Sequence, residues 1–317
     1  MQALVEPETA GDPMTAQKWV RSSLRHLQGR LAQDGHRVSV ETVRRLLRHL
    51  EYALHVNAKK VEASSQHPDR DTQFTYIAEQ RAAFAEAGQP IISVATKKKE
   101  LVGNFKQAGR AWGRAPAAVN VHDFPSDGLG RAVPYGIYDL ARNAGSVAVG
   151  TSGDTAAFAV AAIARWWEQT GRAAYRTGDR LLILADSGGS NNGRARQWKE
   201  RLQAELCDRL GLAVTVCHDP RGCSKWNPIE HRLFSAISQN WAGRPLRTWE
   251  IVLAALRGTT TRAGLTVTAE LDEATYATGQ KVPDAAMAAL NLEHPTVCPT
   301  WNYTLRPRPS STVDLAA

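Results

Sequence analysis

The stretches LLILADSGGSNN, at residues 181–192, and SKWNPIEHR, at residues 224–232, decide the fold predicted for this chain. In the first, five apolar residues lead to Asp186 and predict a buried strand that ends on a carboxylate. In the second, Pro228 predicts the first turn of a helix, and that turn contains Glu230. Ligands of α/β folds bind beyond the carboxyl ends of the strands. Two carboxylates at that edge therefore favour a Mg²⁺ site, because Mg²⁺ prefers oxygen ligands.

Length and composition indicate a globular protein with one large domain and one small one. The chain has 317 residues and an ordinary apolar content. No apolar run approaches the length of a membrane span, and the N-terminus has no secretory signal pattern. The four cysteines form no CxxC pair, which argues against a zinc site and for a reducing cytoplasm. A net charge of +8 is compatible with a polyanionic partner, although proteins without such a partner also reach it.

Residues 15–56 predict a helix-turn-helix module. The first helix spans the apolar residues from Trp19 to Leu31, and Ser39 is a good N-cap for the second. Apolar residues between Val40 and Leu50 form one stripe on the second helix, as in a recognition helix that packs on its partner. Beside the stripe lie three arginines that would reach DNA bases or phosphates: Arg44, Arg45 and Arg48. A small helical bundle with a solvated basic face is the alternative interpretation.

The segments around this module and the large domain are less regular. Residues 1–14 and 308–317 are polar or rich in Pro and Ser, and they predict flexible ends. Residues 57–88 predict a linker followed by a connecting helix. Lys59 and Lys60 in the linker are candidate DNA contacts, although a solvated linker is the commoner case for such a charge run.

Residues 89–307 predict one domain in which strands alternate with helices. The segment from Pro90 to Phe105 has two apolar runs separated by a lysine-rich turn, which predicts a β-hairpin. The apolar residues 156–167 predict a helix that packs on a sheet. This alternation predicts an α/β fold with a mixed sheet and helices on both faces. Further strands are predicted at residues 118–124, 133–140, 146–150, 181–185 and 213–217.

The motifs DSGGSNN and SKWNPIEH, with their flanking sequence, resemble the catalytic core of bacterial insertion-sequence transposases with an Asp-Asp-Glu (DDE) site. The chain is similar to the Rhodopirellula-type transposase family, a distant relative of the mariner-like enzymes, from about Glu6 to Pro307. The resemblance implies a ribonuclease-H-like catalytic domain at residues 89–307 and metal-dependent cleavage and transfer of DNA strands. Members of the family usually carry more helix-turn-helix sequence before this point, so we expect an N-terminally shortened transposase.

The resemblance also implies cofactors and partners. Two Mg²⁺ ions, with Mn²⁺ as a substitute, would be held by Asp186, Glu230 and a third carboxylate. Double-stranded DNA, as transposon ends and target, is the expected substrate, bound by a homodimer or higher oligomer. The expected location is the bacterial cytoplasm, in association with the nucleoid. Four residues are candidates for positioning phosphates or the attacking oxygen, although a loop or cap hydrogen bond is an equal alternative for each: Asn191, Asn192, Lys225 and His231.

Ala95 departs from the family pattern. In the family, the matching strand ends in the first catalytic Asp, followed by Thr-Lys-Lys-Lys-Glu, whereas this chain has Ala95 before those residues. Alanine cannot ligate a metal, so we expect impaired catalysis. The chain would then be a disabled transposase or a DNA-binding protein that regulates or inhibits transposition. Asp123 and Asp139 are rival candidates for the first carboxylate, less favoured because the sequence around residue 95 keeps the family's pattern.

Overall fold

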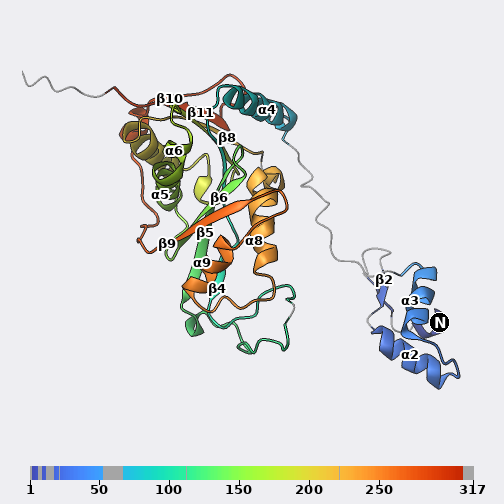
Figure 1. The fold of residues 1–317 in the computed structure, drawn as a ribbon. Helices are drawn as coiled ribbons and strands as arrows, with labels where there is room; N and C mark the ends of the chain where they lie inside the picture. Colours follow the sequence, from blue (N-terminus) through green and yellow to red (C-terminus); the bar gives the residue numbers. More distant parts are fainter. Residues whose placement is uncertain are drawn as a thin grey trace, which may run out of the picture. The chain divides into compact units, whose positions relative to one another are not determined.

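The computed structural model describes residues 2–5, 9–11, 18–20, 22–52, 67–111, 113–220 and 222–309. The chain forms two compact units, residues 1–62 and residues 63–317, and each is described by itself (Figure 1). Lys59, Lys60 and most of the predicted C-terminal tail lie outside the described residues. None of the helices in the described ranges has both the length and the apolar character needed to span a bilayer.

The first unit contains two serine-capped helices. Ser23 caps α2 (Leu24–Gln33) and Ser39 caps α3 (Val40–His49), each by accepting a hydrogen bond from the backbone N–H three residues later. The apolar stripe predicted on the second helix contributes to a small core shared with α1 (Gln2–Val5). The buried residues of this core are Val5, Leu27, Leu31 and Val43.

The first of the two helices begins later than predicted. Trp19 and Val20 belong to β2 (Lys18–Val20), which pairs antiparallel with β1 (Thr9–Gly11). The physical reason lies at Ser23, whose hydroxyl accepts from His26 N and thereby sets the first turn after it. The apolar residues before this cap fit the helical spacing in sequence, but the cap ends the helix before it reaches them.

The second unit is built on a nine-stranded mixed sheet. The strand order is β10-β11-β8-β7-β3-β5-β6-β9, and β4 pairs with β5 off this path. The strands are β3 (Ile91–Thr96), β4 (Glu100–Val102), β5 (Gly130–Asp139), β6 (Ala144–Gly150), β7 (Arg180–Ala185), β8 (Ala213–His218), β9 (Thr266–Asp272), β10 (Leu292–Glu293) and β11 (Asn302–Leu305).

The centre of the sheet has the ribonuclease-H-like arrangement predicted from the sequence. Strands β3, β5 and β6 form an antiparallel meander, and β7 and β8 continue the sheet on the other side of β3, parallel to it and to each other. The crossover from β6 to β7 contains α5 (Ala156–Trp166), as parallel strands require a long connection. The carboxyl ends of β3, β7 and β8 therefore meet at one edge of the sheet.

Helices cover both faces of the sheet, as predicted (Figure 1). One face packs on α5, α7 (Arg196–Arg201) and the π-helix η5 (Leu202–Asp208). The opposite face packs on the π-helix η7, on α8 and α9, and on α4 near β7. The bounds of these and the remaining helices are α4 (Arg70–Glu86), η2 (Pro125–Asp127), η3 (Trp167–Gly171), α6 (Arg172–Ala174), η4 (Gly189–Asn191), η6 (Ser224–Trp226), η7 (Glu230–Phe234), α8 (Ser235–Asn240), α9 (Trp249–Arg257) and α10 (Asp284–Ala288).

Two local predictions were wrong. The apolar runs from Pro90 to Phe105 do not form a hairpin, because β4 pairs with β5 and not with β3. Both edges of β3 are already paired, with β5 and with β7, so β3 has no edge left for β4. Residues 118–124 form no strand and lie in an irregular connection. The strand β9, which extends the sheet parallel to β6, was not predicted.

Gly136 provides a test of how η7 is held against the sheet. A Cβ added at Gly136 would lie 2.5 Å from Phe234 Cε1 and 2.9 Å from Ile229 Cδ1, and both side chains are buried. We expect Gly136→Ala to lower the free energy of unfolding by about 1–3 kcal/mol through overpacking. Chemical denaturation measures this, with Gly113→Ala as the control, since a Cβ there meets nothing closer than 3.4 Å. Equal stability of the two variants would contradict this description of the η7 interface.

Candidate active site

Asp186 lies directly beyond β7, at the edge of the sheet where the sequence places it. The strand before it is buried from Leu181 to Ala185, and Asp186 itself is half-buried. Burial raises the pKa of the Asp186 carboxyl above its ordinary value, and the charge of Asp154 adds to the rise. Hydrogen bonds from the backbone of Gly188 and the side chain of Asn191 oppose it. Asp186 is thus a partly desolvated carboxylate held by the loop that follows it.

Glu230 is positioned by a buried polar contact between β3 and the start of η7. Asn227 is fully buried, donates from Nδ2 to Val94 O at 3.2 Å and accepts a short hydrogen bond from Ser93 Oγ. The same Ser93 Oγ accepts from Ile229 N at 3.0 Å. These contacts attach the first turn of the helix to β3. Glu230 therefore begins η7 over the face of the sheet that carries the Ser93 side chain.

The electrostatic environment of Glu230 links it to the other site residues. Burial raises the pKa of the Glu230 carboxyl, and the charge of Asp186 raises it further, while Lys97 acts in the opposite direction. The two carboxylates predicted from the sequence are therefore within electrostatic reach of each other.

Ala95 occupies the strand next to Asp186. In the parallel register Val94 lies opposite Ala185, so residue 95 and Asp186 follow at the next position of each strand. Ala95 is 2% exposed and packs in the cluster that contains Ile229 and Leu233, on the face covered by η7. The Ala95 side chain therefore faces the helix that carries Glu230, but it offers no oxygen.

Lys97 is a site residue that the sequence analysis missed. Its side chain is 8% exposed, and its Nζ lies 4.6 Å from the ring centroid of Trp241. Burial lowers the pKa of Lys97, and the charges of Glu100 and Glu230 oppose that shift. The period of two along a strand places residue 97 on the same face as residue 95, and that spacing was the available signal.

Asp154 lies beside Asp186 in a pocket of about 390 Å³. It accepts a hydrogen bond from Thr96 Oγ1 at 3.0 Å and pairs with Lys99 Nζ at 3.3 Å. Asp154 was not among the site residues predicted from the sequence. The pocket is further lined by residues at the end of β3 and in the segment after it, and by residues that follow Asp186: Thr96, Lys97, Lys98, Lys99, Gly188, Gly189, Ser190 and Asn191.

Asp219, beyond the neighbouring strand β8, is a second carboxylate that the sequence analysis missed. Its backbone N donates to Ala185 O at 2.8 Å, so it lies next to Asp186 in the sheet. The side chain is 5% exposed, and its Oδ2 is buried without a hydrogen-bond partner in the described part of the chain. Burial raises the pKa of Asp219 to about 7; the charge of Asp186 adds to this and Arg81 on α4 opposes it.

The two rival carboxylates lie on other segments of the domain, β5 and the connection before η2. Asp139 pairs with Ile92, at the end of β3 opposite to residue 95, and it is buried. Tyr175 OH donates to both carboxylate oxygens of Asp139, at 2.8 and 3.0 Å. Asp123 is exposed in the connection before η2. Asp139 therefore lies at the opposite end of β3 from Asp186, whereas Asp123 lies in an exposed connection.

The four auxiliary candidates differ in role. Asn191 is buried, accepts from Tyr135 OH at 2.8 Å and donates from Nδ2 to Val94 O at 3.5 Å, and its side chain lowers the pKa of Asp186. Asn192 Oδ1 accepts from Arg194 N at 2.9 Å, a loop contact. Lys225 is exposed and its backbone O accepts a short hydrogen bond from the ring of His231, which is also exposed.

The arginines of α3 belong to the first unit. Arg44 forms a close ion pair with Glu41, one turn earlier on the same helix. Arg45 and Arg48 are exposed. Within the described ranges, neither has a carboxylate at ion-pair distance. Their charges are available to a polyanion.

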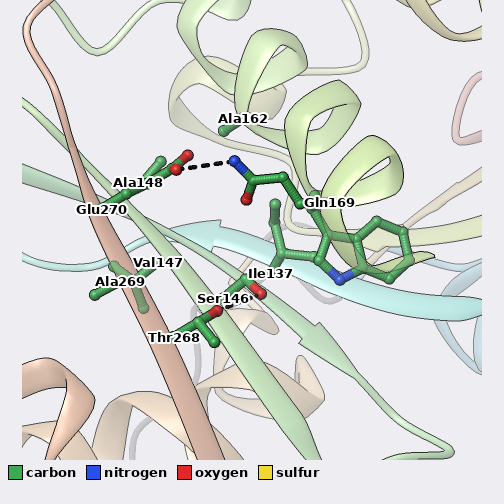
Figure 2. A pocket seen from close by; sticks show the side chains of 10 residues that line it. Ile137, Ser146, Val147, Ala148, Ala162, Gln169, Thr268, Ala269 and Glu270 are labelled. Carbon is green, nitrogen blue, oxygen red and sulfur yellow. Dashed lines mark hydrogen bonds between the residues drawn. The ribbon is translucent and has the colours of Figure 1, made fainter. Parts of the chain in front are cut away.

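A separate pocket of about 110 Å³ lies on the face of the sheet opposite to η7 (Figure 2). Figure 2 shows Gln169 donating to Glu270 across it, at 3.2 Å. Its other labelled residues are small or apolar side chains of β5, β6, β9 and α5. We therefore assign no chemistry to this pocket.

The donors present at the sheet edge suit a hard cation. Asp186 and Glu230 supply carboxylate oxygens, which Mg²⁺ and Mn²⁺ prefer. Within the described ranges, no group of three or more His, Cys, Asp or Glu side chains is placed to hold a metal ion. Asp186 and Glu230 are the two carboxylates that the sequence placed at this edge, and Ala95 lies on β3 beside Asp186.

Comparisons with known proteins identify relatives. A family model described as the Rhodopirellula transposase DDE domain matches residues 1–307. No curated protein matches the chain at a significant level. Among solved structures, the chain is 14% identical to Mos1 transposase in a paired-end complex with the left transposon end, with a TM-score of 0.40 and coverage of 76% of this chain and 72% of that chain. The Mos1 mariner paired-end complex with Mn gives 15% identity with the same TM-score and coverage. These structural likenesses are too weak to assign an activity.

Asp219 gives a pH test of the site's electrostatics. Its pKa is about 7 in the folded chain, above the ordinary value for Asp, so the folded state holds a proton that the unfolded state releases. Stability should therefore fall as pH rises from about 4 to about 7. We expect Asp219→Asn to melt higher than the parent chain at pH 8 and to match it near pH 4, in EDTA. Parallel melting curves for the two proteins across this range would contradict the placement of Asp219.

Proposed function

This chain belongs to the Rhodopirellula transposase DDE-domain family, and we propose that it binds insertion-sequence ends but cleaves and joins them poorly or not at all. The observation that carries the proposal is the position of Ala95. It lies beside Asp186 in the register and faces the helix of Glu230, where a third carboxylate would complete the ligand set.

The cofactor proposed for the site is a pair of Mg²⁺ ions, with Mn²⁺ as a substitute. Asp186 and Glu230 would hold them, and the residues present fit a divalent cation in two ways. The donors are oxygens, and the pKa of Glu230 is raised by burial and by the charge of Asp186, as expected where negative charges share a site. When bound, two such ions supply Lewis-acid stabilisation of the attacking and leaving oxygens of DNA.

The side chains around the carboxylates would orient the site. The side chain of Asn191 lowers the pKa of Asp186 and would help to keep that carboxylate ionised. Lys97 keeps a positive charge near Glu230 in a buried environment, which would attract a DNA phosphate towards the edge of the sheet. With Ala95 the site lacks one ligand, so the attacking oxygen would be poorly activated and poorly aligned.

Double-stranded DNA is the proposed partner, bound as transposon ends and target. The exposed basic face of α3 supports this proposal for DNA binding. It belongs to the first unit, whereas the carboxylates belong to the second. We propose that Arg45 and Arg48 contribute most, because Arg44 is already paired with Glu41. A homodimer or higher oligomer on DNA remains part of the proposal, by membership of the family.

A second function fits the same observation. A family member that keeps its DNA-binding face but lacks a metal ligand would occupy transposon ends and block an active transposase. Ala95 favours this regulatory function as much as it favours a disabled enzyme, and the two differ in whether one substitution restores cleavage.

DNA binding by α3 is tested by replacing its arginines. We expect Arg44→Ala, Arg45→Ala and Arg48→Ala together to weaken binding to duplex DNA of every sequence. The slope of log K against log salt should fall by about one for each arginine that contacts a phosphate. Fluorescence anisotropy at several salt concentrations measures both, with Arg172→Ala, an exposed arginine of the second unit, as the control. An unchanged affinity and salt slope would show that this helix does not bind DNA.

Catalytic impairment is tested by restoring the carboxylate. On duplexes that carry the ends of the insertion sequence encoding this chain, we expect Ala95→Asp to gain strand cleavage and joining in Mg²⁺ or Mn²⁺. Asp186→Ala or Glu230→Ala in that background should abolish the activity again.

Two other outcomes would change the conclusion. A chain that binds the ends but stays inactive after Ala95→Asp is a regulator rather than a disabled enzyme. Full cleavage by the Ala95 chain, lost on Asp123→Ala or Asp139→Ala, would show that the first carboxylate lies elsewhere.

A further inference from the structure

A cavity of about 710 Å³ lies on the far side of the loop that follows Asp186. Its volume is within the range of about 300–1,000 Å³ that is typical of small-molecule sites. The loop separates two pockets: Gly188 to Asn191 line the pocket that contains Asp186, whereas Ser187 and Asn192 to Arg194 line this cavity. The cavity therefore adjoins the carboxylate site without belonging to it.

The wall of the cavity is connected to Asp186 through His218. The His218 ring is buried, and its Nδ1 lies 3.0 Å from Asp186 O. Its Nε2 lies 3.1 Å from Tyr303 OH. A ligand in this cavity would thus rest on a side chain that contacts the backbone of the catalytic carboxylate.

The cavity carries positive charge and no negative charge. Lys199 and Arg194 line it, and none of its lining residues is Asp or Glu. In the described part of the chain, no carboxylate lies at ion-pair distance from either cation. Lys199 is half-buried, with its Nζ 4.8 Å from the ring centroid of Tyr303, and burial lowers its pKa. An anion in the cavity would offset the cost of burying this charge.

Aromatic rings line the same cavity. The rings of Trp301 and His67 lie 4.7 Å apart, edge to face, and both residues line the cavity. Trp301 is half-buried and His67 is exposed at the rim. Rings beside a cationic wall are the combination that binds a nucleotide, because a base stacks on a ring while its phosphate pairs with a cation.

We propose that this cavity is a nucleotide subsite, in which Lys199 and Arg194 bind a phosphate and Trp301 and His67 contact the base. The identity of this nucleotide rests on the proposed function. It flanks the scissile phosphate of the DNA substrate and is not paired with its complementary base. The subsite would anchor the strand on one side of the loop while Asp186 faces the scissile bond on the other.

The test uses the full chain and a defined probe, 2′-deoxyadenosine 5′-monophosphate. Calorimetry should show saturable binding of this nucleotide that is tighter than binding of deoxyadenosine or inorganic phosphate alone. We expect Lys199→Gln and Trp301→Leu each to weaken it by about tenfold or more. Lys199→Arg and Trp301→Phe should retain most of the affinity. Lys281→Gln, an exposed lysine outside the cavity, is the matched control and should change nothing.

The outcomes separate this subsite from the proposed function. If duplex ends bind, but the nucleotide either does not bind or binds equally to Lys199→Gln and Lys281→Gln, the subsite is wrong and the DNA-binding function stands. If the nucleotide binds with the expected variant pattern but duplex ends do not bind, the subsite stands and the function fails. Inorganic phosphate binding as tightly as the nucleotide would overturn the contact with the base. Thermal melting of each variant identifies any that fail to fold. In that case the nucleotide affinities of Lys199→Arg and Trp301→Phe are compared with that of the parent chain.

Discussion

The hydrogen bonds among Ser93, Asn227 and the backbone of Ile229 are the contact on which the site depends. They join the middle of β3 to the start of η7, and all three residues are buried. A buried amide and hydroxyl that satisfy each other specify one arrangement, because any shift leaves an unpaired polar group in a dry environment. This contact fixes where Glu230 begins its helix relative to β3, and the parallel pairing of β3 with β7 fixes where Asp186 lies beside residue 95.

The edge of the sheet brings several carboxylates together, beside the lysines that follow β3. The charge of Asp154 raises the pKa of Asp186, and the charge of Asp186 raises those of Asp219 and Glu230. The buried Lys97 opposes the rise at Glu230. Such an arrangement costs folding free energy without a bound cation and is typical of functional sites. Under the proposed function, an Asp at residue 95 would add to that cost and supply a metal ligand, whereas Ala95 does neither. Stability and metal binding are therefore in opposition at this position.

Features of the fold that depend on neighbouring residues could be predicted from the sequence. The apolar run before Asp186, the proline before Glu230 and the cap at Ser39 each act within a few residues, and each lies where it was predicted. The errors concern pairing between distant segments. Nothing near β4 in the sequence indicates that β3 already has two neighbours, and nothing near Asp219 indicates that β8 ends beside β7. By contrast, the place of Lys97 could have been predicted from the sequence, because it follows residue 95 by the two-residue period of a strand.

Manganese binding tests the central claim, that residue 95 is the vacant position of the first carboxylate, most directly. Electron paramagnetic resonance of free Mn²⁺ gives the number of ions bound and their affinity for the parent chain and for Ala95→Asp, without DNA and without catalysis. We expect Ala95→Asp to bind Mn²⁺ more tightly than the parent chain, and Asp186→Ala in the same background to remove the gain. Identical Mn²⁺ titrations for the parent chain and a folded Ala95→Asp variant would contradict it.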